Sequence, residues 1–128
     1  MKKILVVDDE KEVRELFCRA LASAHYTTES AASGEEALRI IENENFYLLF
    51  FDLNMPGMNG IELCRRVRKL QSISIIFAIT GYASMFHLHE CREAGFDDYF
   101  IKPVSIRTLL DETAAAFKKI DRWLERTK

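Results

Sequence analysis

Residues 47–60 read YLLFFDLNMPGMNG, an apolar run that stops at Asp52 and passes into a loop containing one proline and two glycines. Continuous apolar runs of this length are typical of strands buried on both faces, as in parallel sheets. Open α/β sheets bind their ligands in the crevice beyond the carboxyl ends of the strands. Asp52 is therefore the first candidate for chemistry, and the alternative is that it only caps the loop.

The rest of the chain alternates short apolar runs with stretches of helical periodicity. The short runs predict further strands over residues 4–7, 27–31, 75–79 and 99–101, of which 27–31 is the most polar and suits a sheet edge. Helices are predicted after each strand, the second beginning with a Ser33-x-x-Glu36 capping box, the fourth ending at Gly95 and the last starting near Ser105. This alternation predicts one α/β domain, a parallel sheet with helices on both faces.

Composition limits the classes of protein to which the chain can belong. Of 128 residues, 48% are hydrophobic and 30% are charged, which is ordinary for a globular protein. The formal net charge of −2 gives no general reason to bind nucleic acid or an anionic membrane, so we expect neither direct nucleic-acid binding nor membrane insertion. The start is too short and too acidic for a signal peptide, and three widely spaced cysteines suggest reduced thiols. We expect a cytoplasmic protein.

Four of the five predicted strands end in side chains suited to phosphoryl chemistry. These are Asp8 with Asp9, Asp52, Thr80, and Lys102. The carboxyl ends of parallel strands share one edge of the sheet, so these side chains are expected to converge there. Two carboxylates about 4 Å apart repel by roughly 4 kcal/mol at an effective dielectric near 20. A hard divalent cation offsets that repulsion, and a site built only from oxygen ligands suits Mg²⁺.

Lys102 and Thr80 complete this predicted site. A lysine adds positive charge and a threonine hydroxyl can donate to a phosphoryl oxygen, which is most of what phosphoryl transfer asks of a protein. Each residue alone has another explanation, as a helix cap, a solvated lysine or a partner of a helix dipole. Their coincidence at four strand ends favours the site. His87 and His89, two apart on a predicted helix, make a poor metal pair.

Several motifs resemble the receiver domains of two-component response regulators. They are VVDD at residues 6–9, DLNMPGMNG at 52–60, ITG at 79–81 and YFIKP at 99–103, with SGEEAL at 33–38 and EAGFDDY at 93–99. The resemblance covers residues 3–117. It implies a flavodoxin-like, doubly wound five-stranded parallel sheet of order 2-1-3-4-5 with five helices. We divide the chain into a receiver domain, 1–119, and an extension of the last helix, 120–128.

The resemblance also implies roles for the residues at the strand ends. Asp52 would be the phosphoacceptor, taking a phosphoryl group from a histidine kinase or a histidine phosphotransfer protein. Asp8 or Asp9 would hold Mg²⁺, Asp9 directly, together with the Asp52 side chain and the Asn54 backbone carbonyl. By the same resemblance, Thr80 and Lys102 would contact the phosphoryl group. Such a domain catalyses only its own phosphotransfer and autodephosphorylation.

Further positions match the switch of the same family. Thr80 would move toward the phosphoryl group and Tyr99 would turn inward, altering the face formed by the fourth helix, the fifth strand and the fifth helix. The alternative for Tyr99 is plain core packing. The Lys102–Pro103 peptide is expected to be cis. Asn54 and Tyr82 stand where the family tunes acyl-phosphate lifetime, and we hypothesise that the Tyr82 ring screens the phosphoryl group from water.

The last helix carries apolar residues at a 4-3 spacing that resembles heptad positions. They are Ile106, Leu110, Thr113, Phe117, Ile120 and Leu124. Residues 118–128 would form a homodimerisation helix, dock on the domain or begin an output module, and the sequence leaves these three open. Charges of the kind that form dimer pairs in winged-helix regulators are only partly present. Asp97 and Asp98 fit, whereas Asp111 and Glu112 are acidic where basic partners are expected.

We therefore expect a receiver domain without an output domain, which signals through an unknown downstream protein. One alternative is an aspartate-nucleophile, Mg²⁺-dependent phosphatase, but such enzymes use a second aspartate where this chain has Asn54. A flavin-binding module is another, but the acidic run at residues 8–10 would repel a phosphate that lacks a metal. The third is a phosphorylation-inactive receiver that acts as a binding module.

Overall fold

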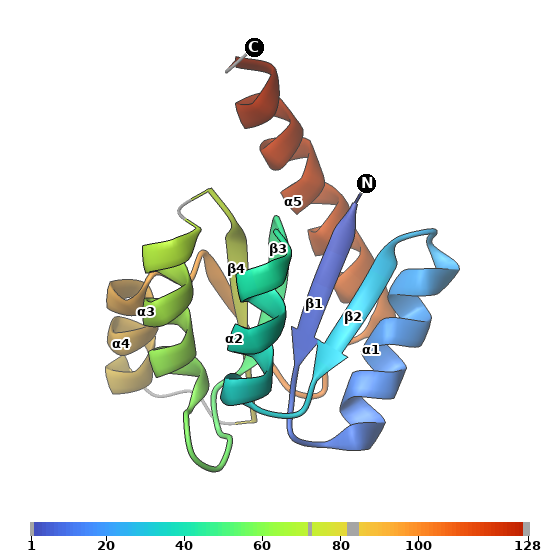
Figure 1. Cartoon of the computed structure of the whole chain (residues 1–128). Coiled ribbons are helices and arrows are strands. Elements are labelled where there is room, and N and C mark those ends of the chain that lie inside the picture. Colours follow the sequence, from blue (N-terminus) through green and yellow to red (C-terminus); the bar gives the residue numbers. More distant parts are fainter. Residues whose placement is uncertain (1, 72, 82–84, 127–128) are drawn as a thin grey trace.

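The computed structural model describes residues 2–71, 73–81 and 85–126, and Figure 1 shows the chain as alternating strands and helices. The strands are β1 (Lys3–Val7), β2 (Thr27–Ala31), β3 (Leu48–Asp52), β4 (Ile75–Thr80) and β5 (Asp98–Ile101). The helices are α1 (Lys11–Ser23), α2 (Gly34–Asn43), α3 (Gly60–Leu70), α4 (Met85–Ala94) and α5 (Ile106–Arg126). None of the helices in these described ranges is long and apolar enough to cross a membrane.

The five strands form one parallel sheet in the order β2-β1-β3-β4-β5, which confirms the predicted fold class and strand order. Side chains alternate between the two faces of a strand. Leu5 and Val7 join the core beneath α2, α3 and α4, while Ile4 and Val6 join the core beneath α1 and α5. Because both faces are covered, the central strands need continuous apolar runs, and every residue of β3 is buried.

Strand bounds differ from the predicted ones by one residue at polar ends. β3 includes Asp52, whose backbone stays in register with Ile79 of β4. β5 begins at Asp98, which pairs with Phe77. The pattern of apolar residues indicates which side chains are buried, whereas the backbone pairing between strands also includes residues with polar side chains.

The loop that follows β3 brings α3 very close to the strand. A Cβ atom on Gly60, the first residue of α3, would lie 2.3 Å from the carbonyl oxygen of Asp52. Only glycine fits there, because no real Cβ approaches a carbonyl oxygen so closely. Asn59 caps the helix by accepting a hydrogen bond from the Glu62 N–H at 2.9 Å. Gly57 has a φ of +75°, a conformation that also favours glycine, so both glycines of residues 47–60 are needed for this turn beside Asp52.

The other predicted helix ends are present as well. Ser33 accepts a hydrogen bond from the Glu36 N–H at 3.1 Å, and the Glu36 carboxylate accepts one from the Ala32 N–H at 3.2 Å. The capping box is thus confirmed, with the glutamate bonding one position before the cap. Gly95 ends α4 with a φ of +110°, a conformation that favours glycine.

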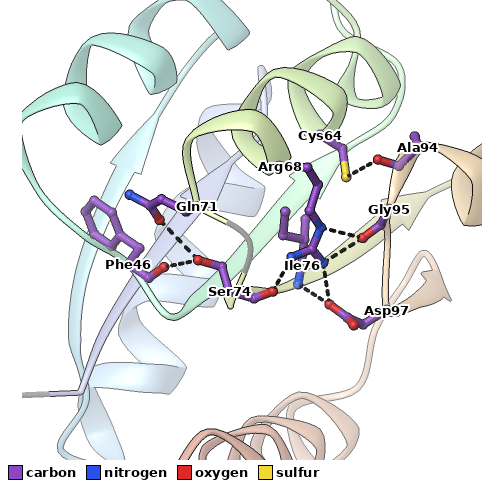
Figure 2. Close-up of polar contacts among 9 residues, drawn as sticks. All are labelled: Phe46, Cys64, Arg68, Gln71, Ser74, Ile76, Ala94, Gly95 and Asp97. Atoms are coloured by element: carbon purple, nitrogen blue, oxygen red, sulfur yellow. Dashed lines mark hydrogen bonds and ion pairs between the residues drawn. The ribbon is translucent and has the colours of Figure 1, made fainter. Parts of the chain in front are cut away.

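Arg68 ties the end of α3 to the segments that precede β4 and β5, as Figure 2 shows. Its guanidinium donates to the carbonyl oxygens of Gly95 and Ser74 and to the Asp97 carboxylate, the last at 2.8 Å. Asp97 also accepts from the Ile76 N–H at 2.8 Å. Asp97, one of the two acidic residues that matched the dimer pairs of winged-helix regulators, is therefore bound within its own chain.

The second half of α5 continues past the amino ends of the strands (Figure 1). Ile120 is 2% exposed in the same core as Phe117, and Leu124 packs against that core. Trp123 is 53% exposed and lines a groove with Ile73, Lys119 and the Arg68–Asp97 pair. The division of the chain at residue 119 stays a prediction, although burial of Ile120 ties the start of the extension to the domain.

Candidate functional site

Four of the predicted site residues stand at the carboxyl edge of the sheet. Asp52 and Thr80 are the last residues of β3 and β4, while Asp8 and Lys102 directly follow β1 and β5. The buried residues among them are Asp8, Asp52 and Thr80, with 1%, 3% and 2% of their surface exposed. Buried polar groups at the ends of three apolar strands are costly unless they are paired, so their partners define the site.

Lys102 is the positive centre of this edge. Its Nζ atom lies 3.0 Å from Asp8 Oδ2, 3.3 Å from Glu10 Oε1 and 3.7 Å from Asp52 Oδ2. Burial lowers the pKa of Lys102, but its hydrogen bond with Asp8 and the charges of Asp52 and Asp8 outweigh burial, so its pKa is raised. The Lys102 side chain thus stays charged between the two buried carboxylates.

The segment that carries Lys102 is fixed by its backbone. The Lys102 N–H donates to the carbonyl oxygen of Thr80 at 2.8 Å, which extends the pairing of β5 with β4. The Lys102–Pro103 peptide is cis, as predicted.

Asp52 combines burial with a crowded electrostatic environment. Burial, as the larger cause, and the nearby Asp8 carboxylate together raise the pKa of its carboxyl to about 7, against the opposing effect of the Lys102 ammonium. Its Oδ1 atom accepts one hydrogen bond, from the Asn54 N–H at 3.3 Å. Such a carboxyl is shielded from bulk water and retains oxygen lone pairs for a ligand or a bond.

The run after β1 supplies the acidic side of the site. Among the described residues, one group of carboxylates has ligand atoms within 4.8 Å of one another, and it consists of Asp8, Asp9 and Glu10. Asp8 accepts a hydrogen bond from the Glu10 N–H at 2.9 Å, and its backbone carbonyl accepts from Arg14 at 2.8 Å. This all-oxygen set fits a hard cation such as Mg²⁺.

Glu10 is the residue that sequence reasoning missed. In the sequence it is only the end of an acidic run, whereas in the structure its carboxylate accepts a hydrogen bond from Lys102, 92 residues away. The exposed Asn54 and Asp9 flank the buried carboxylates. The structure thus brings together Asp8, Asp52 and Lys102 directly, with Asp9 and Asn54 at the border of the site.

The two predicted switch residues differ in exposure. Thr80 is buried at the edge described above, whereas Tyr99 is 38% exposed on β5, paired in register with Ala78. Exposure of this size argues against plain core packing as the whole role of Tyr99. Tyr82, the predicted lifetime residue, lies outside the described residues.

A pocket adjoins the site between the loop after β3 and helix α4. Residues of the loop form one wall, Asp9 reaches it from the run after β1, and α4 contributes His87 and Glu90. His87 and Glu90 are three residues apart and share one helix face. In the sequence their spacing indicates only that they share a helix face. That this face lies near Asp52 follows from the fold.

Comparison with known proteins is consistent across sequence and structure. A family model described as "Response regulator receiver domain" matches residues 4–114. Among curated proteins, ResD, a transcriptional regulatory protein of Bacillus subtilis, is 37% identical over 117 residues, which cover 91% of this chain and 48% of ResD. The response regulator MprA of Mycobacterium ulcerans is 36% identical over 91% of this chain and 50% of its own. The chain thus spans about half the length of these relatives.

Solved structures extend the similarity to the whole fold. A CheY-like response regulator receiver domain protein from Methanospirillum hungatei superposes with a TM-score of 0.92 at 35% identity, covering 95% of this chain and 98% of its own. The chemotaxis protein CheY4 of Vibrio cholerae gives a TM-score of 0.86 at 31% identity, with coverage of 91% and 98%.

Proposed function

This chain belongs to the response regulator receiver domain family, and from that membership we propose that it is a phosphorylation-dependent switch that accepts a phosphoryl group on Asp52. The observation that carries the proposal is the position of Lys102. Its ammonium lies within 3.7 Å of two buried carboxylates, one of which follows the phosphoacceptor pattern of the family. A histidine kinase or a histidine phosphotransfer protein is the proposed donor.

In the proposed transfer, an Asp52 carboxylate oxygen attacks the phosphorus of a phosphohistidine. The bond from phosphorus to the imidazole nitrogen breaks, the imidazole leaves with the electron pair, and an aspartyl phosphate forms. Lys102 is placed to bind a phosphoryl oxygen, and the Thr80 hydroxyl at the adjacent strand end donates to another. The Asn54 N–H orients Asp52 through its 3.3 Å hydrogen bond.

We assign a magnesium site to the same edge. Asp8, Asp9 and Asp52 would hold the ion with their side chains, and Asn54 with its backbone carbonyl. When bound, Mg²⁺ neutralises these carboxylates and shields the negative charge of the donor. The all-oxygen donor set and the raised pKa of Asp52, which burial and Asp8 cause, support a cation at this position.

We propose that the signal leaves through the face formed by α4, β5 and α5. Exposed apolar residues on this face are Tyr99, Ile101 and Ile106. Inward rotation of Tyr99 after Thr80 moves toward the phosphoryl group would remove a half-exposed ring from this face. The partner is a cytoplasmic protein of the same signalling pathway.

A competing function is hydrolysis of an external phosphomonoester by an aspartate nucleophile. Asn54 stands where such enzymes carry their acid or base, and an amide cannot transfer that proton. The receiver reading therefore accounts for the site better.

The test is incubation with Mg²⁺ and phosphoramidate or acetyl phosphate, read by intact mass. We expect one added phosphoryl group, lost in Asp52→Asn and after chelation of the metal. A wild-type chain that stays unmodified, while an active receiver run in parallel is phosphorylated, contradicts the proposal and favours an inactive receiver that acts as a binding module.

A further inference from the structure

The pocket beside Asp52 carries a carboxylate that the proposed transfer does not use, that of Glu90 on α4. We propose that Glu90 is a specificity residue that favours phosphoryl donors with a nitrogen leaving group over acyl phosphates. This inference rests on the proposed function, because it concerns the donors of that same site.

The geometry connects Glu90 to the phosphoacceptor through the pocket wall. Leu53, Asn54 and Met55, which follow Asp52 directly, line the pocket on one side, and Glu90 lines it from α4. Glu90 is half-buried, so its carboxylate is less screened than one in open water. A donor that presents its phosphorus to Asp52 therefore has this pocket as a place for the rest of the molecule.

Among the residues that the structure describes, no lysine or arginine lines the pocket. The described polar residues of its lining are Asp9, Asn54, Asn59, His87 and Glu90. In the proposed metal site the charge of Asp9 is compensated by the ion, which leaves Glu90 as the carboxylate that faces the donor. The asparagine amides and the His87 ring supply hydrogen-bonding groups of either polarity.

Two classes of donor place opposite demands on such a pocket. Phosphoramidate reacts with its nitrogen protonated and phosphohistidine with its other ring nitrogen protonated. The P–N bond breaks, the electron pair stays on nitrogen, and neutral ammonia or imidazole leaves with its N–H groups. In acetyl phosphate the P–O bond breaks, and acetate leaves with the electron pair and a full negative charge. Both donors deliver the same phosphoryl group to an Asp52 oxygen, so a carboxylate in the pocket discriminates by the leaving group alone. It attracts N–H groups and repels acetate.

Charge substitutions on α4 test this inference. The rate constants of phosphorylation by phosphoramidate and by acetyl phosphate are measured by intact mass at saturating Mg²⁺, and their ratio is compared among variants. We expect Glu90→Gln to shift the ratio about fivefold toward acetyl phosphate, and Glu90→Lys to shift it further, beyond about tenfold. Glu93→Gln is the matched control, since Glu93 is an exposed carboxylate on the same helix outside the pocket.

Salt gives a second readout that a purely structural role would not change. Because the discrimination is electrostatic, raising the ionic strength should compress the wild-type ratio and leave that of Glu90→Gln nearly constant. Equal ratios in wild type, Glu90→Gln and Glu90→Lys, with Asp52 still phosphorylated, overturn the inference and leave the proposed function intact. If the wild-type chain accepts a phosphoryl group from neither donor, both the inference and the proposed function are wrong.

Discussion

The ammonium of Lys102 lies 3.0 Å from the Asp8 carboxylate, although β5 and β1 are separated in the sheet by β4 and β3. Lys102 therefore reaches across the ends of two strands, and its Nζ atom also lies 3.7 Å from the carboxylate of Asp52 at the end of β3. The Lys102 ammonium thus interacts with two buried carboxylates, and its interaction with Asp52 is the longer and weaker of the two.

The first prediction concerns pH and Asp52 without metal. The pKa of Asp52 is raised from 3.8 to about 7 in the folded chain, first by burial and then by Asp8. The folded chain therefore binds this proton more tightly than the unfolded chain does, and the contribution of Asp52 to the free energy of unfolding falls as the pH rises from about 4 to about 7. Above that range the destabilisation is complete.

Replacing Asp52 by asparagine should remove this dependence. We expect Asp52→Asn to be more stable than wild type at pH 8, by about 1–3 kcal/mol, with a difference that shrinks toward pH 5. Urea unfolding of both proteins in EDTA across this range measures it. Equal stabilities at pH 8 would show that Asp52 titrates near its ordinary value.

The second prediction concerns metal binding. Mg²⁺ binds only the folded site and should raise the Tm, by the equivalent of about 2.7 kcal/mol when its concentration is 100 times the Kd. Asp9→Asn should lose most of this shift. Glu12→Gln, which alters an exposed acid in the first turn of α1 outside the acidic group, should keep it. If Asp9→Asn keeps the Mg²⁺-dependent rise in Tm, Asp9 is not a metal ligand and interacts with the dipole of α1 instead.

The third prediction concerns the tie between α3 and the turn after α4. Arg68→Ala leaves the Gly95 and Ser74 carbonyls and the Asp97 carboxylate without this donor, so we expect a loss of about 2–4 kcal/mol in the free energy of unfolding. Arg68→Lys should recover only part of it, because an ammonium cannot reproduce the planar fork of donors.

Arg66 provides the control for that experiment. It lies on the same helix, with its side chain 53% exposed and a 3.8 Å contact to Glu62. Arg66→Ala should therefore cost less than about 0.5 kcal/mol. Chemical denaturation of the three variants decides the matter, and similar losses for Arg66→Ala and Arg68→Ala would refute a special role for Arg68.

The fourth prediction concerns the extension of α5. Ile120 is 2% exposed, so Ile120→Ala should destabilise the domain by about 2–4 kcal/mol. Ile106, at the start of the same helix, is 50% exposed, and the same truncation there should cost less than half as much. If both truncations have small and equal effects in thermal unfolding, the helix beyond residue 119 contributes little to the domain.

The sequence was sufficient for the features set by local pattern. Apolar runs located four of the five strands, and their polar ends located Asp8, Asp52, Thr80 and Lys102, whereas β2 was indicated by a more polar run suited to a sheet edge. Contacts between segments that are far apart in the sequence could not be predicted from local patterns. Arg68 and Asp97 are 29 residues apart, and neither sits in a pattern that names the other as its partner.

The exposed ring of Trp123 has a practical consequence. It belongs to the only tryptophan in the chain, and it lies in the groove by Ile73 at the amino ends of the strands, away from the edge that carries Asp52. Its emission is therefore a native optical probe of the end of α5. A blue shift that grows with protein concentration would report self-association there, and one that appears only with another protein would report a complex, with no label attached to the chain.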